Sequence, residues 1–95
     1  MPEPLTQEQI SEALSDLPGW KHDGKELVKW FRFHGFPEAV AFIQRLVEPA
    51  ERLNHHPDIE SHHDRVRIAL HTWTADAITD KDVALAREIE AVAEA

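Results

Sequence analysis

Apolar positions recur at helical spacing in three segments of the chain. The first lies within residues 6–17, where Thr6 and Gln9 have the spacing of a capping box. The last follows Thr79, which we expect to be an N-cap, with Asp82 at the third helical position, where its charge suits the positive end of the helix dipole. These segments are therefore expected to form helices near the two ends of the chain.

The longest helical pattern runs from Pro37 to about Asn54. Pro37 suits the first turn of a helix, where a backbone donor is not needed. Pro49 lies inside the pattern, and because it lacks a backbone N–H we expect it to kink or loosen the helix there. The sequence therefore predicts a third amphipathic helix with an irregularity in its second half.

Alternating positions and β-forming residues indicate strands between these helices. Residues 26–33 are rich in β-branched and aromatic side chains, and residues 65–73 alternate over their whole length. Two weaker segments, 20–22 and 57–61, precede them, and Asp23-Gly24 is a hairpin turn signal. We therefore expect two hairpins.

The expected order is helix, strand, strand, helix, strand, strand, helix. It predicts an α+β fold with a four-stranded antiparallel sheet and three helices on one face. The other face then has to be solvated or covered by another subunit. Edge strands in so small a sheet favour association, so we expect a homodimer or a homotetramer. No linker, repeat or low-complexity segment divides residues 1–95, which we take as a single domain.

Composition and charge exclude several classes of protein. The 95 residues are 42% hydrophobic and 29% charged, as in globular proteins, and the absence of cysteine excludes disulfide scaffolds and thiolate chemistry. The formal net charge of -8 disfavours binding to nucleic-acid phosphates. No apolar run is long enough to span a membrane, and the first residues do not resemble a signal peptide. We therefore expect a cytoplasmic protein without a nucleic-acid or membrane partner.

Histidine is over-represented, with seven residues, four of them in two adjacent pairs. The pair His55-His56 falls at the end of the long helix, and Pro57 disfavours a helical conformation at His56, so that the two rings can converge. Because imidazole titrates near neutral pH, such a pair suits a reaction that needs an acid and a base. A polar helix end is the alternative explanation of this pair, and a solvated turn that of His62-His63. A metal site of histidines alone is a weaker alternative, since no carboxylate completes a ligand set.

The spacing of the chemically active residues resembles that of the pterin-4a-carbinolamine dehydratases over essentially the whole chain. The family pattern is a charged residue, three positions, His-His-Pro, a strand, an aromatic or histidine position and a later Asp. It is formed here by Glu51, His55, His56, Pro57, Trp73 and Asp82. The start of the last helix and the N-terminal region also look like this family. His-His-Pro alone would be unspecific, whereas the combination is specific.

The resemblance implies a reaction. A 4a-hydroxytetrahydropterin would lose water and give the quinonoid dihydropterin, without a metal or an organic cofactor, to recycle the cofactor of aromatic amino-acid hydroxylases. The resemblance implies His55 and His56 as catalytic residues that divide the proton transfers at the 4a-hydroxyl and at N5. The substrate-binding residues that it implies are Glu51, Asn54, Pro57, His71, Thr72, Trp73, Thr74 and Asp82.

Two positions depart from the family pattern. His63 stands where the family usually has Tyr, a change that affects packing rather than chemistry. Trp73 stands where His is common; its ring can stack on a pterin and its indole N–H can donate one hydrogen bond, but it cannot transfer a proton. His71, which would share Trp73's face of the expected strand, could take over part of that role. Packing in a core or an interface is the alternative for Trp73, and helix capping that for Asp82.

A second hypothesis is a non-catalytic binding or assembly protein on the same fold. The family resembled here includes a dimerisation cofactor of a transcription factor and assembly factors of a carbon-fixing enzyme. Fold does not settle function, and Trp73 at the third catalytic position keeps this alternative open. Binding of a pterin distinguishes the two hypotheses.

Overall fold

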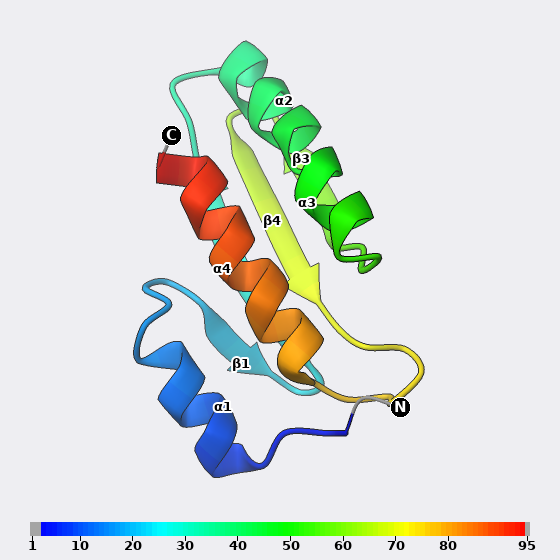
Figure 1. Ribbon diagram of the computed structural model, residues 1–95. Coiled ribbons are helices and arrows are strands. Elements are labelled where there is room, and N and C mark those ends of the chain that lie inside the picture. Colours follow the sequence, from blue (N-terminus) through cyan, green and yellow to red (C-terminus); the bar gives the residue numbers. More distant parts are fainter. Residues whose placement is uncertain (1–2, 95) are drawn as a thin grey trace.

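The computed structural model describes residues 3–94 and contains one antiparallel sheet with helices beside it (Figure 1). The strands pair in the order β1-β2-β4-β3, so β1 and β3 are the edges. The strands are β1 (Lys21–Asp23), β2 (Glu26–Arg32), β3 (Asp58–His62) and β4 (Arg65–Leu70). The helices are α1 (Gln7–Leu14), α2 (Phe36–Arg45), α3 (Val47–Arg52) and α4 (Asp80–Glu94). The expected α+β class and order of elements are confirmed, with the middle helix divided in two.

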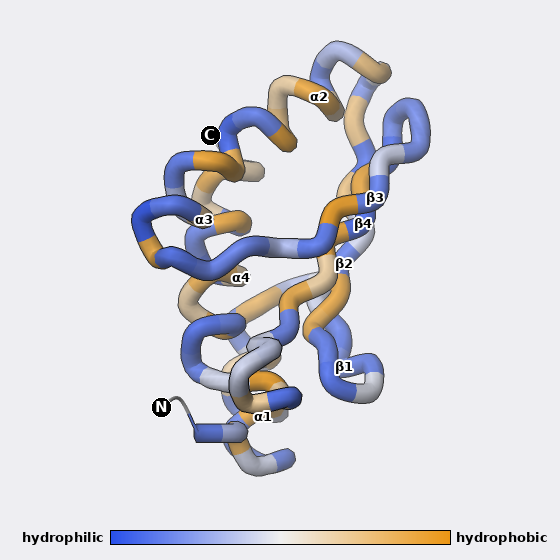
Figure 2. The backbone as a smooth tube through the Cα atoms, turned by 90° about the vertical axis from the view of Figure 1, so that its right-hand side faces the viewer, coloured by the Kyte–Doolittle hydropathy of each residue, from blue (hydrophilic) through white to orange (hydrophobic). Residues whose placement is uncertain are grey.

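The helices lie on one side of the sheet, and the core fills the space between the two layers (Figure 2). Alternate residues of β2 and β4 point to this side, as the two-residue period of a strand requires. The opposite face has no helix layer in the described part of the chain, and Trp30 is 50% exposed there. The largest fully buried apolar side chains are Phe42, Leu27, Leu46, Ile68, Leu70, Leu85, Ile89 and Val66.

Both capping predictions are confirmed. The Thr6 hydroxyl accepts from the Gln9 N–H at 3.1 Å, and the Gln9 side chain accepts from the Thr6 N–H at 2.8 Å. At α4, the Thr79 N–H donates to the Asp82 carboxylate at 2.9 Å, and the Thr79 hydroxyl accepts from the Lys81 N–H at 3.2 Å. Such reciprocal bonds satisfy helix N–H groups that have no partner inside the helix.

The expected irregularity of the long helix is present, but it lies one turn before Pro49. The helix is interrupted at Leu46, whose N–H bonds to the Ile43 carbonyl at 3.0 Å in a tightened turn. A regular helix would bond the N–H of residue 49 to the carbonyl of Arg45, and proline has no such N–H. The missing bond therefore separates α2 from α3 and lets α3 deliver its C-terminus to the start of β3.

The strand expected over residues 65–73 ends at Leu70, so the prediction that it reaches Trp73 is wrong. Leu70 pairs with Leu27, one residue after β2 begins, and β3 begins opposite Ala69. No partner strand extends further along β4 within the described residues, so the chain leaves the sheet. Residues 71–79 form a loop, named the Trp73 loop, which is closed by an isolated bridge between Thr72 and Ala77.

Candidate active site

A surface depression of about 380 Å³ lies where the α3–β3 connection meets the Trp73 loop and the first turn of α4. Two segments far apart in sequence, around residues 54–58 and 71–81, form its walls. Its lining residues are Asn54, His55, His56, Pro57, Asp58, His71, Thr72, Trp73, Thr74 and Lys81. The structure therefore brings together the two histidine-containing clusters that the sequence placed in separate elements.

The end of α3 determines where His55 lies. The His55 N–H donates to the Ala50 carbonyl at 3.0 Å, and the Asn54 N–H donates to the Glu51 carbonyl at 3.1 Å. This pair of bonds is a Schellman motif, which needs a left-handed residue at the position that Asn54 occupies with φ 49°. Asparagine tolerates this conformation better than most residues. Asn54 thus turns the chain so that His55 points back toward α4.

His55 is held by a fully buried carboxylate. Its Nε2 lies 2.6 Å from Oδ1 of Asp82, and Asp82 is 0% exposed. Because a carboxylate only accepts hydrogen bonds, Nε2 donates, and Nδ1 is the ring atom that a ligand would meet. Burial of a carboxylate is costly unless several donors replace the hydrogen bonds lost to water. We therefore expect Asp82 to have further donors besides His55.

The other donors to Asp82 come from the Trp73 loop and the start of α4. The Thr72 hydroxyl donates to Oδ2 of Asp82 at 2.8 Å, next to the Thr79 N–H. Since the Thr72 hydrogen is used there, the Thr79 hydroxyl donates to Thr72 Oγ1, 2.8 Å away. No buried side-chain nitrogen or oxygen in the described residues lacks a hydrogen-bond partner. The network therefore fixes His55, the Trp73 loop and α4 relative to one another.

His56 has a carboxylate partner as well, but in water. Its Nε2 lies 2.6 Å from Oε2 of Glu51, and both side chains are largely exposed. An exposed pair of this kind contributes little to stability, since solvent screens it. The two adjacent imidazoles thus sit in different surroundings, one backed by a buried carboxylate and one by an exposed carboxylate.

Trp73 and His71 do not lie on a common strand face, contrary to the prediction. Trp73 is 75% exposed at the rim of the depression, whereas His71 is 8% exposed beneath it. The rings meet edge to face, with centroids 4.8 Å apart and planes at 88°. His71 Nδ1 lies 2.8 Å from the Lys25 carbonyl and Nε2 lies 3.4 Å from Oδ1 of Asp76. Both nitrogens of His71 are thus turned to acceptors of the protein.

Eight of the ten residues expected at the site line the depression, and Glu51 and Asp82 lie behind His56 and His55. Sequence reasoning missed Asp58, Lys81 and the buried hydroxyl of Thr79. The spacing of Thr79 and Asp82 indicates a helix cap, and it could also have indicated that the two residues share one network. Lys25 and Asp76, 51 positions apart, carry no such signal.

Near the depression, Asp76 is the residue whose pKa is shifted. The hydrogen bond from Lys25 Nζ, 2.6 Å away, and the charge of Lys25 hold the pKa of Asp76 below its usual range. Asp76 therefore stays a carboxylate at mildly acidic pH. Among residues 3–94, no group of three His, Asp or Glu side chains is arranged to hold a metal ion.

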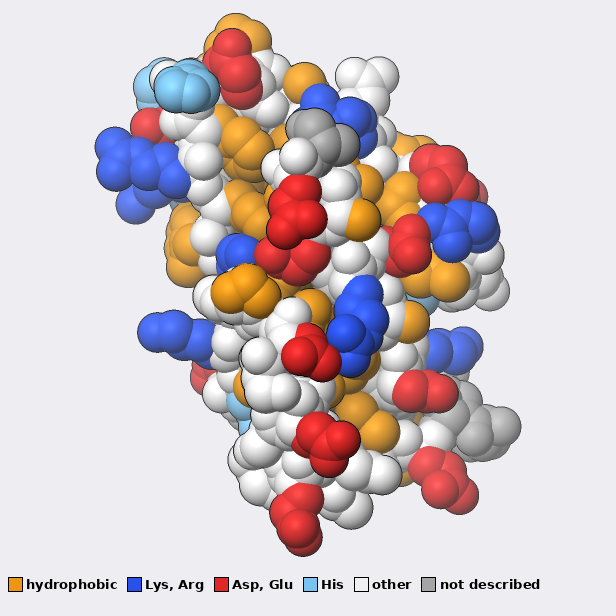
Figure 3. Space-filling view, turned by 60° about the vertical axis from the view of Figure 1, so that its left-hand side comes forward, with side chains coloured by type: hydrophobic (Ala, Val, Ile, Leu, Met, Phe, Trp, Pro, Cys, Tyr) orange, Lys and Arg blue, Asp and Glu red, His pale blue; other side chains and the backbone are white. Residues whose placement is uncertain are grey.

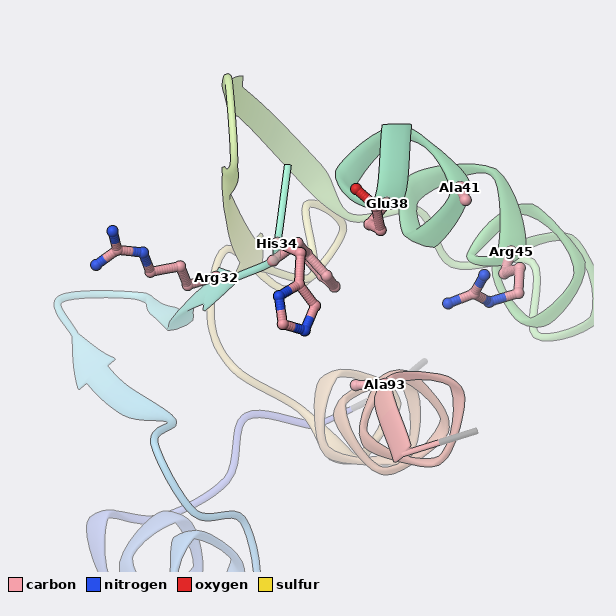
Figure 4. Close-up of a pocket in the computed structure, with 7 residues that line it drawn as sticks. Arg32, His34, Glu38, Ala41, Arg45 and Ala93 are labelled. Atoms are coloured by element: carbon pink, nitrogen blue, oxygen red, sulfur yellow. The ribbon is translucent and has the colours of Figure 1, made fainter. Parts of the chain in front are cut away.

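A larger depression of about 530 Å³ lies between the end of β2, α2 and the end of α4 (Figure 4). Arg32 points away from the other labelled side chains there. His34 lies in the loop between β2 and α2, whereas Arg45 lies at the end of α2. Acidic and basic side chains are interspersed over the neighbouring face of the molecule (Figure 3). Neither feature shows the convergence of groups on a buried carboxylate that marks the His55 depression.

None of the helices between residues 3 and 94 is both long enough and apolar enough to cross a membrane.

Comparison with known proteins identifies a family. The model of the pterin 4 alpha carbinolamine dehydratase family matches residues 3–92. A protein of Thermomicrobium roseum named "Putative pterin-4-alpha-carbinolamine dehydratase" is 42% identical over 89 residues, which are 94% of this chain and 96% of that protein. A protein of the same name from Acidobacterium capsulatum is 43% identical, covering 93% of this chain and 96% of its own.

Two solved structures share the fold. A "transcriptional coactivator/pterin dehydratase" from Brucella melitensis is 34% identical with a TM-score of 0.89, covering 95% of this chain and 98% of that one. A pterin dehydratase-like protein described as a RuBisCO assembly factor in the alpha-carboxysome is 28% identical with a TM-score of 0.67, covering 79% and 89%. Proteins on this fold thus have names from both an enzymatic and an assembly class.

Proposed function

Because the chain belongs to the pterin 4 alpha carbinolamine dehydratase family, we propose that it dehydrates a 4a-hydroxytetrahydropterin to the quinonoid dihydropterin. The observation that carries the proposal is the paired imidazoles at one depression, with His55 backed by the buried carboxylate of Asp82. The reaction is an elimination: the bond from C4a to the hydroxyl oxygen breaks, N5 loses its proton, and the hydroxyl leaves as water after it gains one. It involves no oxidant or reductant.

His55 is suited to the proton at N5. With Nε2–H bonded to Asp82, its Nδ1 carries a lone pair that can accept a proton. The imidazolium that forms would lie against a buried carboxylate, which stabilises it, as in other histidine–aspartate pairs. His55 therefore acts as the base in this proposal.

His56 is suited to the leaving hydroxyl. Its ring is exposed and its Nε2 is paired with Glu51 in solvent, so it exchanges protons with water readily. A protonated His56 could give its proton to the 4a-hydroxyl, and water would restore it. A general acid and a general base of this kind each contribute roughly 10²–10⁴ in rate.

The remaining lining residues would bind the ring of the substrate. Trp73 offers an exposed aromatic face, and Thr74 and Asn54 offer polar groups at the rim. Pro57 and the buried Thr72 shape the floor, the latter through its bond to Asp82. A flat bicyclic ligand with several donors and acceptors fits such a mixture of one aromatic wall and polar edges.

Dehydration of freshly generated 4a-hydroxytetrahydropterin, followed by ultraviolet absorbance, tests the proposal. We expect wild type to accelerate the spontaneous reaction and His55→Ala to lose the acceleration by roughly 10²-fold or more. His62→Ala is the matched control, because His62 belongs to the other histidine pair and its ring contacts that of Trp30, away from the depression. Equal rates for His55→Ala and wild type would refute the role of His55.

A second function, binding or assembly of proteins, is favoured by a different observation. Phe36, Val40 and Val47 are exposed at helical spacing on α2 and α3, and Val47 lines a small depression together with Ile59 of the edge strand β3. We propose that this face takes a protein partner or further copies of the chain, as a homodimer or homotetramer would require. A folded wild-type protein that leaves the spontaneous dehydration rate unchanged would make this the main function.

A further inference from the structure

Side-chain hydrogen bonds hold the part of the Trp73 loop around Trp73 on two sides. On one side, the Thr72 hydroxyl donates to the buried Asp82. On the other, Asp76 accepts from Nζ of Lys25, which lies in the turn between β1 and β2. The first tie belongs to the network around His55, whereas the second joins the loop to a hairpin that contributes no residue to the lining of the depression.

The second tie is a three-residue arrangement, here called the Lys25 cluster, made of Lys25, His71 and Asp76. The carbonyl of Lys25 accepts from Nδ1 of His71, and its ammonium donates to Oδ2 of Asp76. Nε2 of His71 lies 3.4 Å from Oδ1 of the same carboxylate. An isolated exposed ion pair contributes little to stability. The Lys25–Asp76 pair, however, lies against the buried ring of His71, whose two nitrogens have no other described partner. We therefore expect the three residues to act together.

The cluster determines the position of Trp73 through two contacts. The edge-to-face contact places the indole against the ring of His71. The turn that carries Trp73 closes when the Asp76 N–H donates to the Trp73 carbonyl at 3.2 Å, with Asp76 in the left-handed region at φ 49°. Asp76 therefore bears both the backbone bond that shapes the turn and the charge that anchors it.

We propose that the Lys25 cluster is a positioning device for Trp73 and that Trp73, so held, determines affinity for the flat ring of the substrate. The proposal rests on the proposed dehydratase function for the identity of that ring. Trp73 cannot transfer a proton, and His71 has both nitrogens turned to the protein, so neither residue adds a third acid or base. The loop then affects how well the ring is bound and leaves the rate of elimination to His55 and His56.

Asp76→Asn is the sharpest variant, because asparagine tolerates a left-handed backbone while the charge facing Lys25 and His71 disappears. We expect faster amide hydrogen exchange over residues 72–77 and a shifted indole N–H resonance of Trp73, assigned with Trp73→Phe. We also expect KM to rise about threefold to tenfold with kcat changed by less than about twofold. Asp23→Asn, which removes a carboxylate from the neighbouring strand β1, is the matched control and should change none of these.

Lys25→Met, with Lys21→Met as its control, removes the anchor and leaves the loop sequence intact, and it should reproduce the same pattern. Unchanged exchange and an unchanged indole resonance in both cluster variants would overturn the positioning role, and so would a fall in kcat at constant KM. A wild-type protein without dehydratase activity would refute the proposed function instead, while exchange and the indole resonance would still decide whether the cluster positions Trp73.

Discussion

At Asp82, one carboxylate serves donors from three separate parts of the chain: His55 after α3, Thr72 after β4, and the backbone of Thr79 before α4. Under the proposed function this carboxylate serves both stability and catalysis, because the donors that make its burial tolerable include His55, which the reaction needs in a fixed position. The sequence indicated Asp82 as a cap or as a site residue. In the structure it is a cap whose second oxygen reaches the histidine.

Asp82→Asn is expected to lower kcat by about 10- to 100-fold, since an amide cannot stabilise an imidazolium as a carboxylate does. The amide nitrogen would also face donors, so unfolding should become easier by about 1–3 kcal/mol. Urea unfolding and the dehydration assay measure the two effects. Asp80→Asn, two positions earlier and exposed, should show neither. Full activity in Asp82→Asn would contradict the role given to the pair with His55.

The elements show where local sequence signals are sufficient. The caps at Thr6 and Thr79 and the turn at Gly24, with φ 61°, follow from residue types that act within a few positions. The end of β4 does not, because it depends on where β2 and β3 stop, and alternation in the sequence continues past that point. Pro49 predicts an irregularity in this helix but not its position at Leu46, since proline removes the hydrogen bond to the carbonyl one turn before it.

The Schellman motif at the end of α3 leads to a prediction about Asn54. Asn54→Gly should leave the free energy of unfolding near that of wild type, because glycine adopts a positive φ without strain. Asn54→Ala should lower the free energy of unfolding by about 1 kcal/mol, the cost of a left-handed alanine. It should also reduce turnover relative to Asn54→Gly, which lacks the same side-chain amide, because His55 is the next residue of the motif. Equal behaviour of the two variants in urea unfolding and in turnover would show that the backbone turn is not what positions His55.

At the scale of the whole molecule, the site is formed by segments distant in the sequence, which the packed core and the hydrogen bonds to Asp82 bring together. Residues 54–58 arrive from the helices and residues 71–82 from the sheet, and the common core under both sets their separation. The sequence resemblance predicted a set of site residues, and eight of the ten line one depression. It could not indicate that Trp73 stands outward at the rim while His71 lies beneath it, because this depends on a loop anchored to a turn 51 positions away.

The exposed apolar face of α2 and α3 leads to a prediction about assembly. Phe36, Val40 and Val47 recur at helical spacing with Ile59 of the edge strand nearby, a combination that favours contact with other copies. Sedimentation equilibrium of wild type should give a mass above that of one chain, and Val47→Glu should shift it toward the monomer. Gln44→Glu adds the same charge on the side of α2 nearer α4 and should leave the mass unchanged. A monomeric wild type would contradict this prediction.

The arrangement of the three tryptophans has an optical consequence. Trp20 is buried with its indole N–H bonded to Glu90, Trp30 is half exposed on the open face of the sheet, and Trp73 stands at the rim of the depression. Indole emission depends on the polarity of the surroundings and on stacked neighbours. An aromatic ligand at the rim would therefore change the light from one of the three fluorophores. The molecule thus carries a native reporter at its candidate site, readable without any added label.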